Sequence, residues 1–225
     1  MEGLDRKSSE TDPVSEADRE AERAIEEILV AERPDDGLLA EEGASSESEN
    51  GRRWVVDPLD GTVNFLYGLP AWCVSIGLED AGGAVVGVIH DPLRRETFRA
   101  TRGAGAELNG EPIRVGDRDR LETALIATGF SYEPDRRAEQ AAILARVLPR
   151  VRDVRRAGAA ALDLAWVAAG RVDGYYERGG KPWDWAAGLL LVEEAGGAVS
   201  ELPGEPLGQA AANPRLLPEL LELVT

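Results

Sequence analysis

Two aspartates three positions apart, Asp57 and Asp60, are the residues of this chain most clearly able to do chemistry. They lie in residues 54–65, which read WVVDPLDGTVNF, so an apolar stretch leads into two carboxylates and then into Gly61-Thr62. Carboxylate oxygens bind hard cations, whereas the free N–H groups at the start of a helix bind anions. A strand that ends here and a helix that begins at Gly61-Thr62 could therefore hold a cation and a phosphate at one point.

Each acidic position also has a simpler interpretation. Residues 57–61 have the composition of an ordinary turn, because Asp, Pro and Gly are frequent in turns. Glu41 and Glu42 stand before a predicted loop and could be solvated charges. Asp184 stands where an apolar helix begins and could be its N-cap, which would stabilise that helix by about 1 kcal/mol. Residue types alone leave these alternatives open.

The first half of the chain has the pattern of an antiparallel sheet. A Ser-x-x-Asp start at Ser15 and apolar residues at helical spacing predict an amphipathic helix over residues 15–30, and an exposed loop is predicted over residues 43–53. Asn109-Gly110 is a two-residue hairpin signal. Strands are predicted at residues 53–56, 72–79, 84–90, 96–100, 106–108 and 112–115.

After Gly116 the pattern changes to strands that alternate with helices. The strands are predicted at residues 124–127 and 151–155 and at Tyr175-Tyr176-Glu177, and the helices at residues 136–148, 160–169, 185–195 and 214–223.

The charge of the chain limits the partners that it attracts. Acidic residues outnumber basic residues by 42 to 25, which gives a net charge of -17. Such a surface repels nucleic acid and anionic membranes at long range, so neither is expected as a direct partner. It would also repel a phosphorylated substrate, so phosphate chemistry here needs local positive charge, which a bound metal would supply.

Neither secretion nor membrane insertion is expected. The mostly apolar residues 157–169 are too few and too interrupted to cross a bilayer, and no signal peptide opens the chain. We therefore expect a soluble, cytoplasmic protein. The single cysteine, Cys73, is expected to be a small buried residue, and the single histidine, His90, is expected to be structural because no second catalytic group lies near it.

Three separated motifs follow one another along the chain: Glu41-Glu42, the sequence DPLDGTVNF at residues 57–65, and the sequence WDWAAG at residues 183–188. In this order they resemble the inositol monophosphatase family of magnesium-dependent, lithium-sensitive phosphatases. The similarity extends over nearly the whole chain from Lys7-Ser8-Ser9 onward.

The resemblance implies the fold and the assembly. We expect an α/β (α+β) layered sandwich like that of inositol monophosphatase and fructose-1,6-bisphosphatase, and a homodimer. Residues 1–115 would form an antiparallel-sheet half that carries metal-binding motifs, and residues 116–225 an α/β half with the substrate-specificity segment and the last metal ligand. Family members usually carry a further helix before the Lys7 region, where this sequence has six residues.

The resemblance also implies a site that holds two or three Mg²⁺ ions. One magnesium, with Glu41 and Thr62, activates the attacking water, and a second stabilises the leaving oxygen, so Glu41, Thr62 and Asp60 are the expected catalytic residues. Asp18 would lie at the outer edge of the site. The expected metal ligands are the carboxylates of Glu41, Asp57, Asp60 and Asp184 and the carbonyl oxygen of Leu59.

Substrate recognition is expected mainly from the second half. The resemblance implies that Glu177 hydrogen-bonds sugar hydroxyls, and ordinary strand packing is expected of at least one of its neighbours Tyr175 and Tyr176. Residues 158–160 would line the substrate at a helix start with free N–H groups. The expected substrate-binding residues are Gly61 and Thr62, through their N–H groups, with Gly158, Ala159, Ala160, Glu177 and Asp184.

These residues favour a phosphomonoesterase that hydrolyses inositol monophosphate with a metal-activated water. Histidinol phosphate, fructose 1,6-bisphosphate and nucleotide 3',5'-bisphosphates are alternative substrates on the same fold. Two other classes are carried as alternatives: a partner-binding regulatory protein of the transcription machinery, and a protein that only stores or senses a cation.

Overall fold

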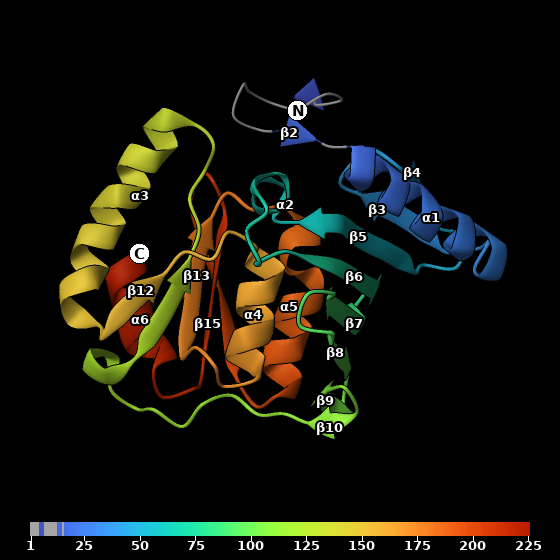
Figure 1. Ribbon diagram of the computed structural model, residues 1–225. Helices are drawn as coiled ribbons and strands as arrows, with labels where there is room; N and C mark the ends of the chain where they lie inside the picture. Colours follow the sequence, from blue (N-terminus) through green and yellow to red (C-terminus); the bar gives the residue numbers. More distant parts are fainter. Residues whose placement is uncertain (1–4, 7–12, 15) are drawn as a thin grey trace.

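The fold is described from a computed structural model that places residues 5–6, 13–14 and 16–225 (Figure 1). The predicted Ser15 cap and the Lys7-Ser8-Ser9 segment of the resemblance lie outside the described residues. The helices are α1 (Glu16–Glu32), α2 (Thr62–Tyr67), α3 (Pro134–Val147), α4 (Ala160–Ala168), α5 (Pro182–Glu194) and α6 (Leu217–Val224), with short 3-10 turns at Leu121–Thr123 and Leu148–Arg150.

An eight-stranded sheet occupies the first half, in the order β10-β9-β8-β7-β6-β5-β3-β4. All neighbours are antiparallel except β3 and β5, so the predicted antiparallel character is confirmed for every other pair. The strands are β3 (Gly37–Ala40), β4 (Ser45–Ser46), β5 (Arg53–Asp60), β6 (Cys73–Asp80), β7 (Gly83–Asp91), β8 (Glu96–Thr101), β9 (Gly105–Leu108) and β10 (Glu111–Pro112), and a separate pair is formed by β1 (Asp5–Arg6) and β2 (Pro13–Val14).

A five-stranded sheet follows, in the order β12-β11-β13-β15-β14. β11 is parallel to both of its neighbours, and β15 is antiparallel to both of its own. The strands are β11 (Leu125–Thr128), β12 (Asp153–Arg155), β13 (Gly174–Arg178), β14 (Ala198–Leu202) and β15 (Gly208–Ala212).

The two sheets enclose α4 and α5, which makes the molecule a layered sandwich (Figure 1). The main core lies between these layers, a second apolar cluster joins the five-stranded sheet to α3 and α6, and a third packs α1 against β3 and β5. α5 is apolar on nearly all sides because it meets a sheet and another helix at once. The expected α/β layered fold is confirmed.

The predicted turn at residues 109–110 is confirmed, whereas two predicted element boundaries are wrong. Asn109 and Gly110 form the predicted hairpin turn, both with the positive φ that such a turn requires (52° and 88°). The strand predicted over residues 112–115 is wrong, because β10 ends at Pro112 and the chain leaves β9 after the Ile113 N–H donates to the Ala106 carbonyl at 3.0 Å. Val115 donates instead to the Ala195 carbonyl at 3.1 Å. The helix predicted from residue 214 begins at Leu217.

The single cysteine and the single histidine are in strands, as expected. Cys73 is fully buried, and burial raises the pKa of its thiol well above the usual range. The Nδ1 atom of His90 lies 2.9 Å from the Thr97 hydroxyl on the neighbouring strand. Across the described residues, none of the helices combines the length and the apolar character that a bilayer-spanning segment needs.

Candidate active site

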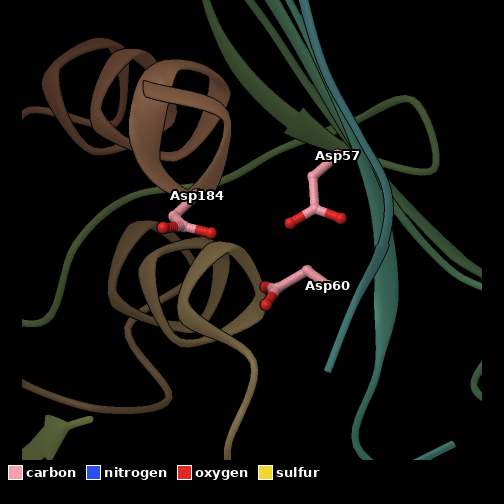
Figure 2. Close-up of side chains that lie close together, drawn as sticks. All are labelled: Asp57, Asp60 and Asp184. Carbon is pink, nitrogen blue, oxygen red and sulfur yellow. The ribbon is translucent and has the colours of Figure 1, made fainter. Parts of the chain in front are cut away.

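The candidate site is built on β5, where an irregularity in the strand turns two carboxylates to the same side. In a regular strand, residues three positions apart point to opposite faces. Here Asp57 pairs with Ser75 and Asp60 with Cys73, so three steps along β5 match two steps along β6. Pro58, which cannot donate to the ladder, lies in this bulge. Both aspartates are buried and point into one space (Figure 2).

Asp184 of α5 completes an acidic cluster with these two aspartates. One carboxylate oxygen from each of Asp57, Asp60 and Asp184 lies within 4.8 Å of the others (Figure 2). The interpretation of Asp184 as an N-cap is wrong, since Lys181 is the N-cap and donates its N–H to Asp184 Oδ2 at 2.5 Å. The capping contact therefore fixes a carboxylate that also faces the other two.

The cluster is electrostatically unfavourable without a cation. The pKa of Asp57 lies well above its usual range because of burial first, then the negative charges of Glu41, Asp60 and Asp184, and then a side-chain hydrogen bond with Glu41. Two carboxyl groups can hydrogen-bond to each other only by sharing a proton. A divalent cation would replace that proton and neutralise the repulsion, so this set of hard oxygen donors fits a metal ion.

Glu41 is positioned by its backbone and by α1. Its N–H donates to the Val56 carbonyl of β5 at 3.1 Å. The following turn is held by Glu22, whose carboxylate accepts the N–H groups of Glu42 at 2.7 Å and Ala44 at 3.0 Å. The interpretation of Glu41 as a solvated surface charge is wrong, because its side chain is partly buried and reaches Asp57.

The start of α2 brings Thr62 against Asp18. Thr62 Oγ1 lies 2.9 Å from Asp18 Oδ1 and 3.1 Å from the Leu59 carbonyl oxygen, so two acceptors compete for its single proton. Asp18 is fully buried. Gly61 precedes the helix with φ 95°, and a Cβ atom there would lie 2.9 Å from the Ala71 carbonyl oxygen, so glycine is required for the close turn.

Asp60 connects β5 to the start of α4. The N–H of Ala160 donates to its Oδ1 at 3.2 Å, and the N–H of Ala161 donates to its Oδ2 at 2.7 Å. The expectation that the Ala160 N–H is free for substrate is therefore wrong. Burial raises the pKa of Asp60 to about 7, although these two N–H groups act in the opposite direction.

A cavity of about 350 Å³ opens over the cluster. The structure brings the predicted catalytic, metal-binding and substrate-binding residues to its wall, from β5, β13 and α5, from the starts of α2 and α4, and from the turn after β3. These residues are Glu41, Asp57, Leu59, Asp60, Gly61, Thr62, Gly158, Ala159, Ala160, Glu177 and Asp184.

Glu177 lies on the α4 and β13 side of this cavity. Burial, followed by the charge of Asp184, raises the pKa of its carboxyl group to about 7. The Tyr175 hydroxyl donates to Glu177 Oε2 at 3.0 Å, so the fully buried Tyr175 both packs and orients this carboxylate. Tyr176 is buried in the second core cluster, as ordinary strand packing would place it.

Several residues of the cavity wall were missed by sequence reasoning, among them the ionisable residues Asp163 and Arg156. Asp163 is 1% exposed, its Oδ1 has no hydrogen-bond partner in the described part of the chain, and burial raises its pKa well above the usual range. A lone carboxylate in the otherwise apolar helix α4 was the available signal. Arg156 follows another arginine directly before the turn at Gly158, and that pair gave no indication of which side chain enters the cavity.

Comparison with known proteins decides the family. The profile described as "Inositol monophosphatase family" matches residues 2–224. The chain belongs to the inositol monophosphatase family. The inositol-1-monophosphatase SuhB of Mycobacterium tuberculosis is 45% identical over 228 residues, which cover 96% of this chain and 79% of that protein. The Nus factor SuhB of Xylella fastidiosa is 48% identical over 197 residues, covering 87% and 71%.

A solved structure agrees with the sequence relatives. The crystal structure of the extragenic suppressor protein suhB from Bartonella henselae matches with a TM-score of 0.93 and 42% identity, covering 99% of this chain and 88% of that chain. The predicted resemblance and the layered fold are both confirmed. Membership of the inositol monophosphatase family supports a phosphatase, and the acidic cluster is where a metal ion would bind.

Proposed function

We propose that this protein is a magnesium-dependent phosphomonoesterase that hydrolyses inositol monophosphate to inositol and phosphate. The observation that carries the proposal is the convergence of Asp57, Asp60 and Asp184 within 4.8 Å, two of them buried, at the base of a cavity. Relatives named inositol-1-monophosphatase support the substrate class.

The metal would be held by oxygen donors alone. Asp57, Asp60, Asp184 and Glu41 supply carboxylates and Leu59 a carbonyl, a donor set that suits two or three Mg²⁺ ions better than softer metals. When bound, the ions lower the pKa of water and stabilise negative charge on the transferred phosphate. They would also supply the positive charge that a chain of net charge -17 otherwise lacks at this point.

Thr62 is suited to take a proton from the attacking water. Thr62 Oγ1 would take a proton from the water as its own hydroxyl proton passes to Asp18 Oδ1, 2.9 Å away, so the proton ends on the Asp18 carboxylate. Glu41 lies on the same cavity wall and can accept from the same water. The N–H groups of Gly61 and Thr62 would bind phosphate oxygens as charge develops on them.

The sugar alcohol would lie between Glu177 and residues 158–160. Glu177 accepts hydrogen bonds from ring hydroxyls, and the Tyr175 hydroxyl holds it in place. Gly158, Ala159 and Ala160 add backbone surface rather than bulky side chains, which leaves room for a ring. The resemblance further supports a cytoplasmic homodimer.

A regulatory role is a second candidate. Its basis is the relative named Nus factor SuhB, which is 48% identical over 197 residues. The two roles are separable, because partner binding would survive loss of the metal ligands. A pull-down of transcription factors by Asp60→Asn as efficient as by the wild type would support the second role.

The test of the enzyme is phosphate release from inositol 1-phosphate, histidinol phosphate and fructose 1,6-bisphosphate, with magnesium and with EDTA. We expect magnesium-dependent turnover, fastest with inositol 1-phosphate, and loss of turnover by at least about 100-fold in Asp60→Asn. Asp80→Asn, a change at an exposed aspartate paired with Arg102, is the control and should be as active as wild type. Dominant turnover of histidinol phosphate would overturn the substrate, and turnover in EDTA would overturn the mechanism.

A further inference from the structure

Four basic side chains line the cavity, and they differ in the contacts that they make with the described residues. Arg136 pairs with Glu133 at 2.8 Å, and Arg178 donates to carbonyl oxygens that include Pro203 at 3.1 Å. Lys181 stands at the start of α5. Arg156, by contrast, makes no hydrogen bond or ion pair with any described residue, although its neighbour Arg155 pairs with Asp153 at 2.6 Å.

The backbone holds Arg156 over the cavity. Asn64 of α2 donates from Nδ2 to the Ala157 carbonyl at 2.8 Å, which fixes the segment that carries the arginine. Gly158 then leaves space for the guanidinium, since a Cβ atom there would overlap Arg156 Nη1 and lie 2.9 Å from Asn64 Nδ2. The guanidinium therefore lies against Gly158, which the Asn64 side chain of α2 also approaches.

The charge of Arg156 faces two buried carboxyl groups across the cavity. It acts on Asp163 and on Glu177, lowering the pKa of each against the larger effect of burial, yet it forms an ion pair with neither. A guanidinium that remains uncommitted in an acidic cavity is available for an anionic ligand. Its planar fork of N–H donors matches the geometry of a phosphate group.

We propose that Arg156 is a substrate-binding residue whose guanidinium binds phosphate oxygens of the substrate. The proposal deepens the proposed function and rests on it. The phosphate could be the one that is hydrolysed or a second one on a bisphosphate substrate, and the chemistry is the same in both cases. Arg156 would supply positive charge from the protein itself, in addition to the charge of the bound magnesium ions.

Three variants test the proposal. Arg156→Gln removes the charge, Arg156→Lys keeps the charge but loses the fork, and Arg155→Gln is the matched control one residue away and outside the cavity wall. The side chain of Arg156 is exposed, so all three should fold like the wild type, which thermal unfolding would verify.

The readouts are KM, kcat and competitive inhibition by inorganic phosphate. Loss of a charged hydrogen bond predicts a roughly tenfold rise in KM or in the inhibition constant for Arg156→Gln, a smaller rise for Arg156→Lys, and no change for Arg155→Gln. A weaker inhibition by phosphate assigns the contact to the hydrolysed phosphate. A rise confined to KM for fructose 1,6-bisphosphate assigns it to a second phosphate. Unchanged constants for every ligand in Arg156→Gln would overturn the proposal.

Calorimetry separates this inference from the proposed function. If the wild type hydrolyses none of the esters, the proposed function fails, but binding of inorganic phosphate to the protein in magnesium can still be measured. A roughly tenfold weaker affinity in Arg156→Gln would then support the role of Arg156 in phosphate binding. Equal affinities in the two proteins would refute it.

Discussion

Replacing Asp60 with asparagine should stabilise the metal-free protein at alkaline pH, although it abolishes the proposed activity. Asp60 is buried beside other carboxylates, and its pKa is raised from 3.8 to about 7 in the folded protein. Folding therefore favours the protonated form. As pH rises from about 4 to 7, the wild type loses stability, because the unfolded chain releases its proton before the folded chain does.

The size of the effect follows from the two pKa values. The difference between 3.8 and about 7 corresponds to about 4 kcal/mol once both states are ionised. The amide group of the Asp60→Asn variant has the shape of a protonated carboxyl group. Both groups have one carbonyl oxygen, which can accept a hydrogen bond from only one of the two N–H groups, that of Ala160 or that of Ala161. The variant therefore behaves like the protonated wild type, and neither species keeps both of the hydrogen bonds that the ionised carboxylate accepts. We expect Asp60→Asn to raise the free energy of unfolding by about 2–4 kcal/mol at pH 8, and by less at pH 5.

Urea unfolding in EDTA, followed by the fluorescence of the five tryptophans, measures this gain. Asp80→Asn is the control, because Asp80 is exposed and hydrogen bonding from Arg102 lowers its pKa, so this change should give no gain at pH 8. A less stable Asp60→Asn protein at pH 8, or a gain that does not grow between pH 5 and pH 8, would refute the account of the acidic cluster.

Three further predictions address the metal, the substrate and the turn. Magnesium should raise the thermal midpoint of the wild type more at pH 8 than at pH 6, since protons compete for the same carboxylates, and an equal rise at both pH values would count against the cluster as the site. Glu177→Gln should raise KM for inositol 1-phosphate severalfold but leave KM for phenyl phosphate unchanged, because phenyl phosphate offers no hydroxyls to Glu177. Equal increases in the two KM values, measured by steady-state kinetics, would argue against this role. Gly61→Ala should lower the urea midpoint by the equivalent of roughly 1–3 kcal/mol, given φ 95° and the 2.9 Å approach of a Cβ atom to the Ala71 carbonyl, and an unchanged midpoint would contradict the requirement for glycine.

The sequence was informative about the site because its residues come in compact motifs. Residues 57–62 supply two carboxylates and a helix start within one segment, and the resemblance assigned metal binding to the Leu59 carbonyl and to the acidic positions Glu41 and Asp184. The arrangement of Asp57 and Asp60 on one side of β5 was not predictable from alternation, since it depends on a bulge against β6. Residue spacing without the partner strand would have placed them on opposite faces.

Individual strands and side-chain positions were missed where the local sequence signal was weak. β15 reads GQAAA, which lacks the branched and aromatic residues typical of strands, and it forms because it pairs with β13 on one side and β14 on the other. Asp163 lines the cavity because of the way α4 is oriented, and Arg156 lines it because of the turn before α4. Both depend on tertiary packing, which the local sequence does not reveal. The free N–H expected at Ala160 is used by Asp60, a residue 100 positions away in sequence.

The most direct test of the central claim is a crystal structure with Mn²⁺ and inorganic phosphate, in which anomalous scattering locates the metal. The account predicts a metal peak bound by carboxylate oxygens of Asp57, Asp60 and Asp184, with phosphate in the cavity beside it, and no such peak in Asp60→Asn crystals treated in the same way. Metal peaks only at other carboxylates of this acidic chain, with these three aspartates unliganded, would contradict it.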